Sequence, residues 1–206
     1  WQRDLSFSHN RIGDMLEAQG EGPAALAAYE RGLAIAATLV GRDPANTLWQ
    51  RDCTIGHNRI GNLLATRGDG PAALAAYRRG LAITTELVGR DPANTLWQHD
   101  LSVSHEKIGD VLVSQGDGPG AFAAFGRSHA IRQALAERDP ANTGWQRDLA
   151  ISLNRIGDAI NTQGDGAGAL AVYRTSLGIA QALAGHDPAN TAWSRDVAVS
   201  HNRIAD

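Results

Sequence analysis

Tryptophan recurs in this chain at a fixed interval of 48 residues, without insertion or deletion, at Trp1, Trp49, Trp97, Trp145 and Trp193. The interval divides the chain into four complete repeats and a partial fifth, with the bounds 1–48, 49–96, 97–144, 145–192 and 193–206. The first two repeats are identical at 34 of 48 positions. A fixed period of this length predicts a solenoid, in which each unit packs mainly on its neighbours.

Each repeat is predicted to contain two helices. In the second repeat, Thr47 and Gln50 have the spacing of a capping box, which predicts Thr47 as the N-cap of the first helix. One face of this helix is apolar apart from a histidine, and it carries Trp49, Cys53, His57, Ile60 and Leu64. Gly68 is expected to end the helix in a left-handed conformation, and Pro71 to lie in the first turn of the next one. No strand pattern appears, so the chain is predicted to be all-α.

Glycine recurs in the middle of every complete first helix, at positions 13, 61, 109 and 157. Glycine in a helix interior costs about 1 kcal/mol relative to alanine, so its repetition predicts close contact between helices. We expect Gly61 to face Ala73 of the second helix. The tryptophans begin the apolar stripe of the first helix, so Trp49, Trp97 and Trp145 are expected to pack between successive repeats.

The stretch from His9 to Ile35 resembles a tetratricopeptide repeat, through Ile12-Gly13, Leu16, Gln19-Gly20, Ala25, Tyr29 and Leu33. The pattern returns in the next three repeats, with Phe125 replacing the tyrosine once. The resemblance implies a right-handed α-solenoid of stacked antiparallel helical hairpins, running through residues 1–206 as a single repeat array. Because the usual period of the family is about 34 residues, each unit here is a long-helix variant.

The resemblance also implies a function, namely a non-catalytic scaffold for protein–protein interaction whose partner is a protein or peptide. First helices line the concave face in this family, and the corresponding positions here are Asn10, Asp14, Glu17, Asn58, Asn62, Glu106, Asp110, Asn154, Asp158 and Asn161. The residue at the position of Glu17 differs from repeat to repeat, which fits adaptation to a ligand and neutral drift equally. The carboxylate clamp of the family needs two lysines, whereas Lys107 is the only lysine of this chain. A partner gripped by its C-terminus is therefore not expected.

Residue types that carry chemistry occur here in positions that suit packing. His9 and Asp14 recur together, but five residues is not the spacing of a metal-binding pair on a helix. Asp4 has a counterpart in every unit, which predicts a contact between adjacent helices rather than a single active site. Arg11 is expected to pair with Asp14 along the helix or across repeats. Cys53 occupies a core position, and the sequence predicts no enzyme, no metal site and no cofactor.

Charge and hydropathy restrict the partners further. The chain has 19 basic and 22 acidic residues and a formal net charge of −3, which argues against a general nucleic-acid binder. Its apolar stretches are short and interrupted, so no segment is expected to cross a membrane. No signal-peptide pattern is present; the compartment stays open, with the cytoplasm favoured.

A structural role is the rival prediction, either as a segment of a long array or as the subunit of a filament. Neither end carries the polar cap that solenoids need for solubility. The two open ends are expected to be the two halves of one internal interface. Copies would then associate head to tail, with end-to-end stacking through Trp1, Leu5, Val197 and Ile204.

Overall fold

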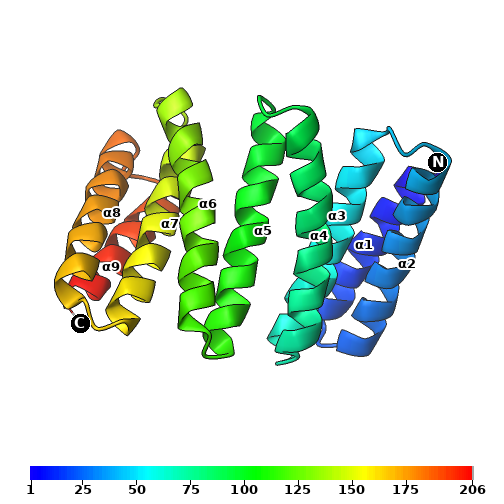
Figure 1. The fold of residues 1–206 in the computed structure, drawn as a ribbon, viewed down its shortest axis with the longest axis horizontal. Helices are drawn as coiled ribbons and strands as arrows, with labels where there is room; N and C mark the ends of the chain where they lie inside the picture. The colour runs from blue at the N-terminus through cyan, green and yellow to red at the C-terminus, as the bar shows by residue number, and fades with distance from the viewer. Residues whose placement is uncertain (206) are drawn as a thin grey trace. The chain divides into compact units, whose positions relative to one another are not determined.

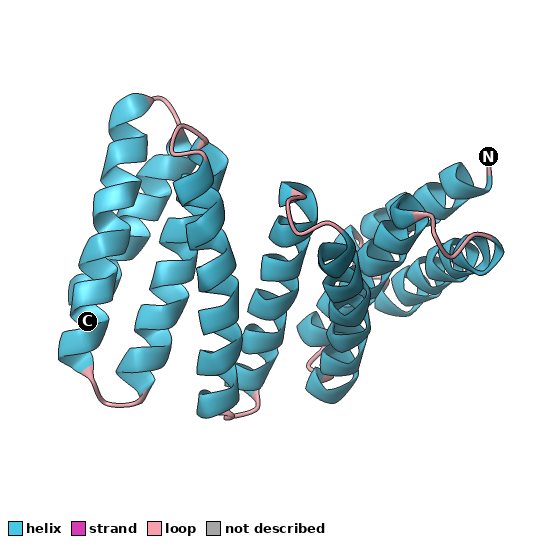
Figure 2. Ribbon diagram, turned by 45° about the horizontal axis from the view of Figure 1, so that its top comes forward, coloured by secondary structure: helices cyan, strands magenta, loops and turns pink. Residues whose placement is uncertain are grey.

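The computed structural model describes residues 1–205, which form nine helices and no strand in that range (Figures 1 and 2). First helices of the repeats are α1 Gln2–Ala18, α3 Thr47–Thr66, α5 Thr95–Ser114, α7 Thr143–Thr162 and α9 Thr191–Ala205. Second helices are α2 Gly22–Arg42, α4 Gly70–Arg90, α6 Gly118–Arg138 and α8 Gly166–His186. The prediction of an all-α chain of helical hairpins is confirmed.

The chain divides into two compact units, Trp1–Val111 and Leu112–Asp206. The first unit contains α1 to α4 and most of α5, and the second contains α6 to α9. Within each unit, the two helices of a repeat pack on each other, as α1 on α2 and α7 on α8. The second helix of a repeat then packs on the first helix of the next, as α2 on α3 and α8 on α9.

Helix ends follow from side-chain capping. The N-cap of α3 is Asn46, whose side-chain oxygen accepts a hydrogen bond from the backbone N–H of Trp49 at 3.1 Å. The prediction of Thr47 as the cap is therefore wrong by one residue. The amide of Gln50 donates instead to the carbonyl of Pro44 in the preceding linker, at 2.8 Å. At the other end of α3, Gly68 has the expected positive φ of 80°.

In each hairpin that lies wholly within one unit, a tyrosine ring of the second helix packs against a glycine of the first helix. A Cβ atom added to Gly61 would lie 2.6 Å from the ring of Tyr77, and Gly13 and Gly157 face Tyr29 and Tyr173 in the same way. The atoms nearest to Gly61 belong to Tyr77 and not to Ala73, the predicted neighbour, which is fully buried one turn away on α4. Close contact between the helices is confirmed, and the aromatic ring is the reason for it.

The recurring aspartate forms the predicted contact between adjacent first helices. Arg3 Nε donates to Asp52 at 2.7 Å, and the same ion pair joins Arg51 to Asp100 and Arg147 to Asp196. Arg and Asp are 49 residues apart in each pair, so every contact joins neighbouring repeats. The tryptophans of the interior repeats are half-buried, whereas Trp1 is 96% exposed.

One helix, α2, bears on the expectation that no segment crosses a membrane. By length and composition α2 is apolar enough to do so, with a mean hydropathy of 1.2 over its most apolar window. A third of that window is buried, and α2 packs against both α1 and α3. In this structure α2 is a helix of the hairpin array.

Candidate functional site

A pocket of about 390 Å³ lies between the first helices α1 and α3. Phe7 and Ile55 form its apolar part, and Asn10 and Arg59 contribute polar groups. Phe7 is 61% exposed, so a bound side chain would cover an apolar surface that now faces solvent. Asn10 is only 7% exposed, and the oxygen of its side-chain amide, Oδ1, has no hydrogen-bond partner among the described residues. The pocket thus offers an apolar surface beside a recessed amide.

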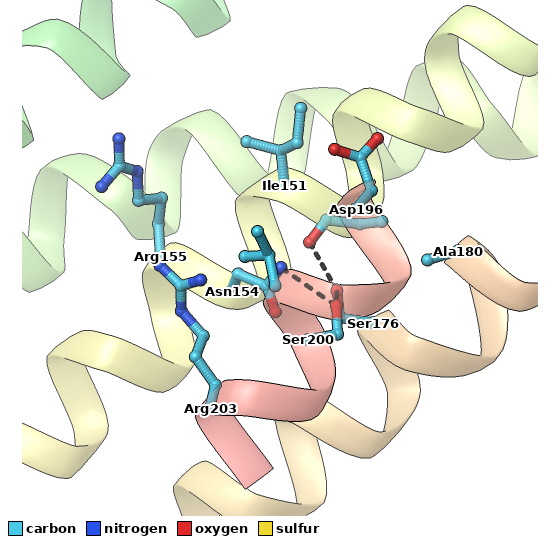
Figure 3. A pocket seen from close by; sticks show the side chains of 10 residues that line it. Ile151, Asn154, Arg155, Ser176, Ala180, Asp196, Ser200 and Arg203 are labelled. Carbon is cyan, nitrogen blue, oxygen red and sulfur yellow. Dashed lines mark hydrogen bonds between the residues drawn. The ribbon is translucent and has the colours of Figure 1, made fainter. Parts of the chain in front are cut away.

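The second unit contains the corresponding pocket, of about 170 Å³, between α7, α8 and α9 (Figure 3). Ile151 and Val199 stand where Phe7 and Ile55 stand, and Asn154 takes the place of the recessed asparagine. Each residue lies 144 positions beyond its counterpart, which is three periods of 48. The same pocket is therefore built twice by the repeat.

Two serines give the asparagine of the second pocket hydrogen-bonding neighbours. Asn154 Nδ2 donates to Ser200 Oγ at 3.4 Å, and Ser200 Oγ lies 3.5 Å from Ser176 Oγ (Figure 3). The first unit has glycines at the two serine positions, Gly32 and Gly56. The asparagine amide of the first pocket has neither of these partners, so that pocket leaves more room and more unused hydrogen-bonding capacity.

The charges around both pockets are paired between repeats. Arg203 donates to both carboxylate oxygens of Asp158, at 2.7 and 2.9 Å, and these bonds raise the pKa of Arg203. Arg59 contacts Asp14 in the same register, and burial lowers the pKa of Arg59, with a smaller contribution from Arg11. The predicted pairing of Arg11 with Asp14 within one helix is replaced by pairing across the repeat. These pairs cancel most of the charge at the pockets, and Asp4, which also lines the first pocket, is paired only with the amino group of Trp1.

Several predicted ligand contacts accept hydrogen bonds from the tyrosine of their own repeat: Asp14 and Glu17 from Tyr29, Asn62 from Tyr77, and Asp158 from Tyr173. These bonds hold the hairpins together, so the four side chains have a structural role. Burial raises the pKa of Tyr77 to about 12, which keeps its hydroxyl protonated as a donor.

The remaining predicted contacts divide between the pockets and other positions. Asn10 and Asn154 line the two pockets. Asn58 is half-buried, and its carbonyl oxygen lies against Gly80. Asn161 is exposed near the C-terminal end of α7, and Glu106 and Asp110 lie on α5, outside these two pockets. The structure thus brings only part of the predicted set to a surface where a ligand fits.

Sequence reasoning missed the apolar side chain at the seventh position of each repeat. Phe7, Ile55, Val103, Ile151 and Val199 recur there, two residues after the core position of Leu5 and its counterparts. A second recurring apolar position beside the core stripe is the signal that could have found the pockets. The asparagine at the tenth position was among the predicted contacts, and both pockets contain it.

The side chains predicted to stack at the ends lie on first helices. Trp1 and Leu5 are exposed, at 96% and 44%, whereas Val197 and Ile204 on α9 are half-buried. Inside each unit, however, the main contact between repeats joins a second helix to a first helix. Direct stacking of α9 on α1 would join two first helices, which differs from that internal contact, and stacking through the ends stays a prediction.

A second groove lies on the side of the second helices. Its volume is about 450 Å³, and it runs between α2 and α4 over α3. Leu33, Ile60 and Leu64 provide large apolar side chains, and His57 and Arg79 lie beside them. Burial and the charge of Arg79 lower the pKa of His57, so this ring is a neutral packing group near pH 7. This groove is a rival position for a ligand.

Groups that support catalysis are scarce in the described part of the chain. Residues 1–205 contain no cluster of three or more His, Cys, Asp or Glu that could hold a metal ion. Cys53 is 5% exposed, and burial raises the pKa of its thiol to about 11, so it is a protonated core residue near pH 7. His129 lies 3.0 Å from Ser152 Oγ, but its ring is half-buried between helices.

Comparison with known families agrees with this architecture. The family model described as tetratricopeptide repeat matches residues 10–46 and 58–94, the central parts of the first two repeats. A comparison with curated protein sequences finds no significant match.

Solved structures show the same fold at low sequence identity. BtubC (BKLC) from P. vanneervenii has a TM-score of 0.71 at 21% identity, with 88% of this chain and 65% of that chain covered. The apo form of RapI has a TM-score of 0.70 at 13% identity, over 99% of this chain and 53% of RapI. This chain thus spans less than two thirds of the length of these two proteins.

A putative kinesin light chain from Podosopora anserina, described as having nearly identical TPR-like repeats, gives a TM-score of 0.63. Its identity is 14%, and the match covers 100% of this chain and 89% of that one. Like this chain, it is built from repeated helical units. The matched repeats of this chain are tetratricopeptide repeats, and its helical hairpins have the fold of solved tetratricopeptide-like repeat proteins.

Proposed function

We propose that this chain is a non-catalytic scaffold whose first helices bind an extended segment of a partner protein. Tetratricopeptide-like repeat proteins are typically protein-interaction scaffolds, which supports the general role. The observation that carries the more specific proposal is the pocket that recurs at an interval of 144 residues. A binding surface made of equivalent pockets suits a ligand whose own backbone repeats, which is an extended peptide.

The chemistry of the pockets fits such a ligand. Phe7 and Ile55 can cover an apolar side chain of the peptide, and the buried Asn10 lies beside them in the wall of the same pocket. The ion pair between Arg3 and Asp52 borders the same pocket and leaves it without strong net charge. A phosphate or a nucleic acid would lack the unpaired cations it requires, so apolar and uncharged polar peptide segments are the proposed ligands.

A displayed library of unstructured peptides, selected on the purified chain, tests this proposal. Peptides selected on the wild type should bind Phe7→Ser at least about tenfold more weakly, because covering a phenyl ring contributes about 1.5–3 kcal/mol. Met15→Ser is the matched control, since Met15 is equally exposed on α1 but lies outside this pocket. Both variants should unfold at the wild-type urea concentration. Equal loss of affinity in the two variants, or none, would contradict a site in this pocket.

A structural role through self-association is the second candidate. It is favoured by exposed large apolar side chains on α1, among them Leu5, Phe7, Ile12 and Met15. Head-to-tail stacking of α9 on α1 would leave the position of a second helix unfilled between them. Sedimentation at increasing concentration tests this candidate: filament growth through the ends requires species that enlarge without limit, and Leu5→Asp on α1 should stop that growth.

A further inference from the structure

The groove between α2 and α4 has walls of small side chains above a floor of large apolar ones. Three consecutive helices of the first unit form it, and its volume of about 450 Å³ lies in the range of ligand sites. The floor belongs to α3, where Ile60 and Leu64 are half-buried. The walls carry alanine at positions 34 and 37 on α2 and at positions 72, 75 and 76 on α4. These small walls leave the apolar floor within reach of a partner.

The spacing of the wall residues is that of a helix-packing surface. On each wall they recur at intervals of three and four residues, which places them in one line along the helix. Alanine in such a line lets another helix approach closely. A helix laid between the two walls can place its own apolar residues, at the same intervals, against Leu33, Ile60 and Leu64.

Each wall also carries one charge that has no partner of opposite sign. Glu30 on α2 and Arg79 on α4 line the groove, both are exposed, and neither makes an ion pair within residues 1–205. The pocket between α1 and α3 differs in this respect, since Arg3 and Asp52 are paired there. Opposite charges on facing walls favour an occupant that carries a basic residue on one flank and an acidic residue on the other.

The second unit lacks these features at the corresponding positions, two periods of 48 residues further along the chain. Gly126 and Thr175 replace Glu30 and Arg79, so both charges are absent there. Val172 replaces the alanine at position 76, so one wall carries a larger side chain. The charged groove is therefore a property of the first unit and not a necessary product of the repeat.

We propose that this groove binds an amphipathic helix of a partner protein, with apolar residues against α3, a basic residue toward Glu30 and an acidic residue toward Arg79. Because the two charges lie on opposite walls, they set the direction of the bound helix: a reversed helix would bring like charges together. The site is separate from the pocket between α1 and α3, to which α3 contributes Ile55 rather than Ile60. The proposal therefore does not rest on that pocket.

Two designed helical peptides test the proposal by their difference in affinity for the purified chain. Each is alanine-rich, about 15 residues long, and carries leucines at intervals of three and four along one face. The first peptide has lysine on one flank of the leucine face and glutamate on the other, and the second has lysine on both flanks. The wild type should bind the first peptide at least about threefold more tightly, because the second brings lysine to Arg79 in either direction.

Reversal of one wall charge gives the sharper test. Arg79→Glu should invert the preference, because both walls are then acidic. Arg78→Glu is the matched control: it makes the same change of net charge at the next residue of α4, which is exposed and outside the groove, and it should keep the wild-type preference. Both variants should keep the wild-type urea midpoint, since the substituted side chains are exposed. Failure of both peptides to bind, an unchanged preference in Arg79→Glu, or an inversion in Arg78→Glu would each overturn the proposal.

Competition separates this site from the pocket on the first helices. A library-selected peptide whose binding depends on Phe7 should not displace the first helical peptide, because the two sites use different residues of α3. Displacement would place the helical peptide in the pocket between α1 and α3, which would overturn the groove as its site and leave the pocket standing. Loss of the Phe7-dependent peptide alone, with helical binding and its charge preference retained, would overturn the pocket and support the groove.

Discussion

The ring of Tyr77 occupies the space that a side chain at position 61 would need. A Cβ atom at Gly61 would lie 2.6 Å from that ring, and real Cβ atoms do not approach so closely. The helix accepts the unfavourable glycine because the ring then fills the contact between the two helices of the repeat. Its hydroxyl reaches Asn62 at 2.7 Å, so packing and hydrogen bonding act together at one residue.

Gly61→Ala should therefore destabilise the chain by about 1–3 kcal/mol, despite the better helix propensity of alanine. Gly89→Ala is the matched control on α4, since nothing lies within 4 Å of the Cβ it would gain. That control should be neutral or stabilising by up to about 1 kcal/mol. Urea unfolding of both variants measures the difference. Equal stability of the two proteins would contradict the packing of Tyr77 against Gly61.

Histidine and leucine exchange places between the two units. His57 on α3 and Leu33 on α2 line one groove, and the corresponding residues of the second unit are Leu153 on α7 and His129 on α6. Burial lowers the pKa of both histidines, and the charges of Arg79 and Arg132 lower it further. One imidazole and one leucine side chain thus occupy each of these junctions.

The lowered pKa values make stability depend on pH in a definite direction. In the unfolded chain both histidines take up a proton near their ordinary pKa of 6.5, whereas in the folded chain they resist it. Stability is unaffected by them well above that pH and falls as the pH drops through it. His57→Leu should reduce the loss of unfolding free energy between about pH 7.5 and pH 5.5, measured by urea melts. An unchanged loss would mean that His57 titrates normally in the folded protein.

At the scale of the helix, the ion pairs between successive first helices set the register of the repeats. Arg51 and Asp100 have side chains that are 27% and 18% exposed, and their closest atoms are 2.5 Å apart. Solvent still reaches both partners, so the pair contributes modestly and is sensitive to salt. Its value lies in fixing which turn of one helix meets which turn of the next.

A double-mutant cycle of Arg51→Ala and Asp100→Ala measures that contribution. The coupling energy should be about 0.5–1 kcal/mol at low salt and should shrink at about 1 M salt. The corresponding cycle of Arg147→Ala and Asp196→Ala in the second unit should give the same result, because the geometry repeats. A coupling that is absent, or that salt leaves unchanged, would contradict a solvent-accessible ion pair.

The sequence predicted these elements well wherever the repeat made a position recur. Recurrence identified the glycine at position 61, the aspartate series and the left-handed Gly68, which the structure confirms. Recurrence does not predict which side chain fills the space beside Gly61, because an alanine and a tyrosine both recur on the second helix. The cap was misplaced because Asn46 and Thr47 are both good capping residues, and backbone geometry decides between them.

At the scale of the whole chain, periodicity places equivalent pockets in both units while local substitutions make them different. The pocket of the first unit is larger, and its asparagine lacks the serine partners present in the second. We therefore expect the first unit to bind a peptide more tightly than the second. The sequence alone did not identify the pockets, since their volume depends on how Phe7 and Ile55 stand beside the paired charges.

Amide chemical-shift mapping with a peptide selected on the wild-type chain tests the central claim most directly. We predict the largest shifts on the first helices around Phe7, Asn10 and Ile55, and small shifts around Glu30 and Arg79 in the groove between α2 and α4. Shifts centred on that second groove, with Phe7 and Asn10 unmoved, would contradict a ligand site on the first helices.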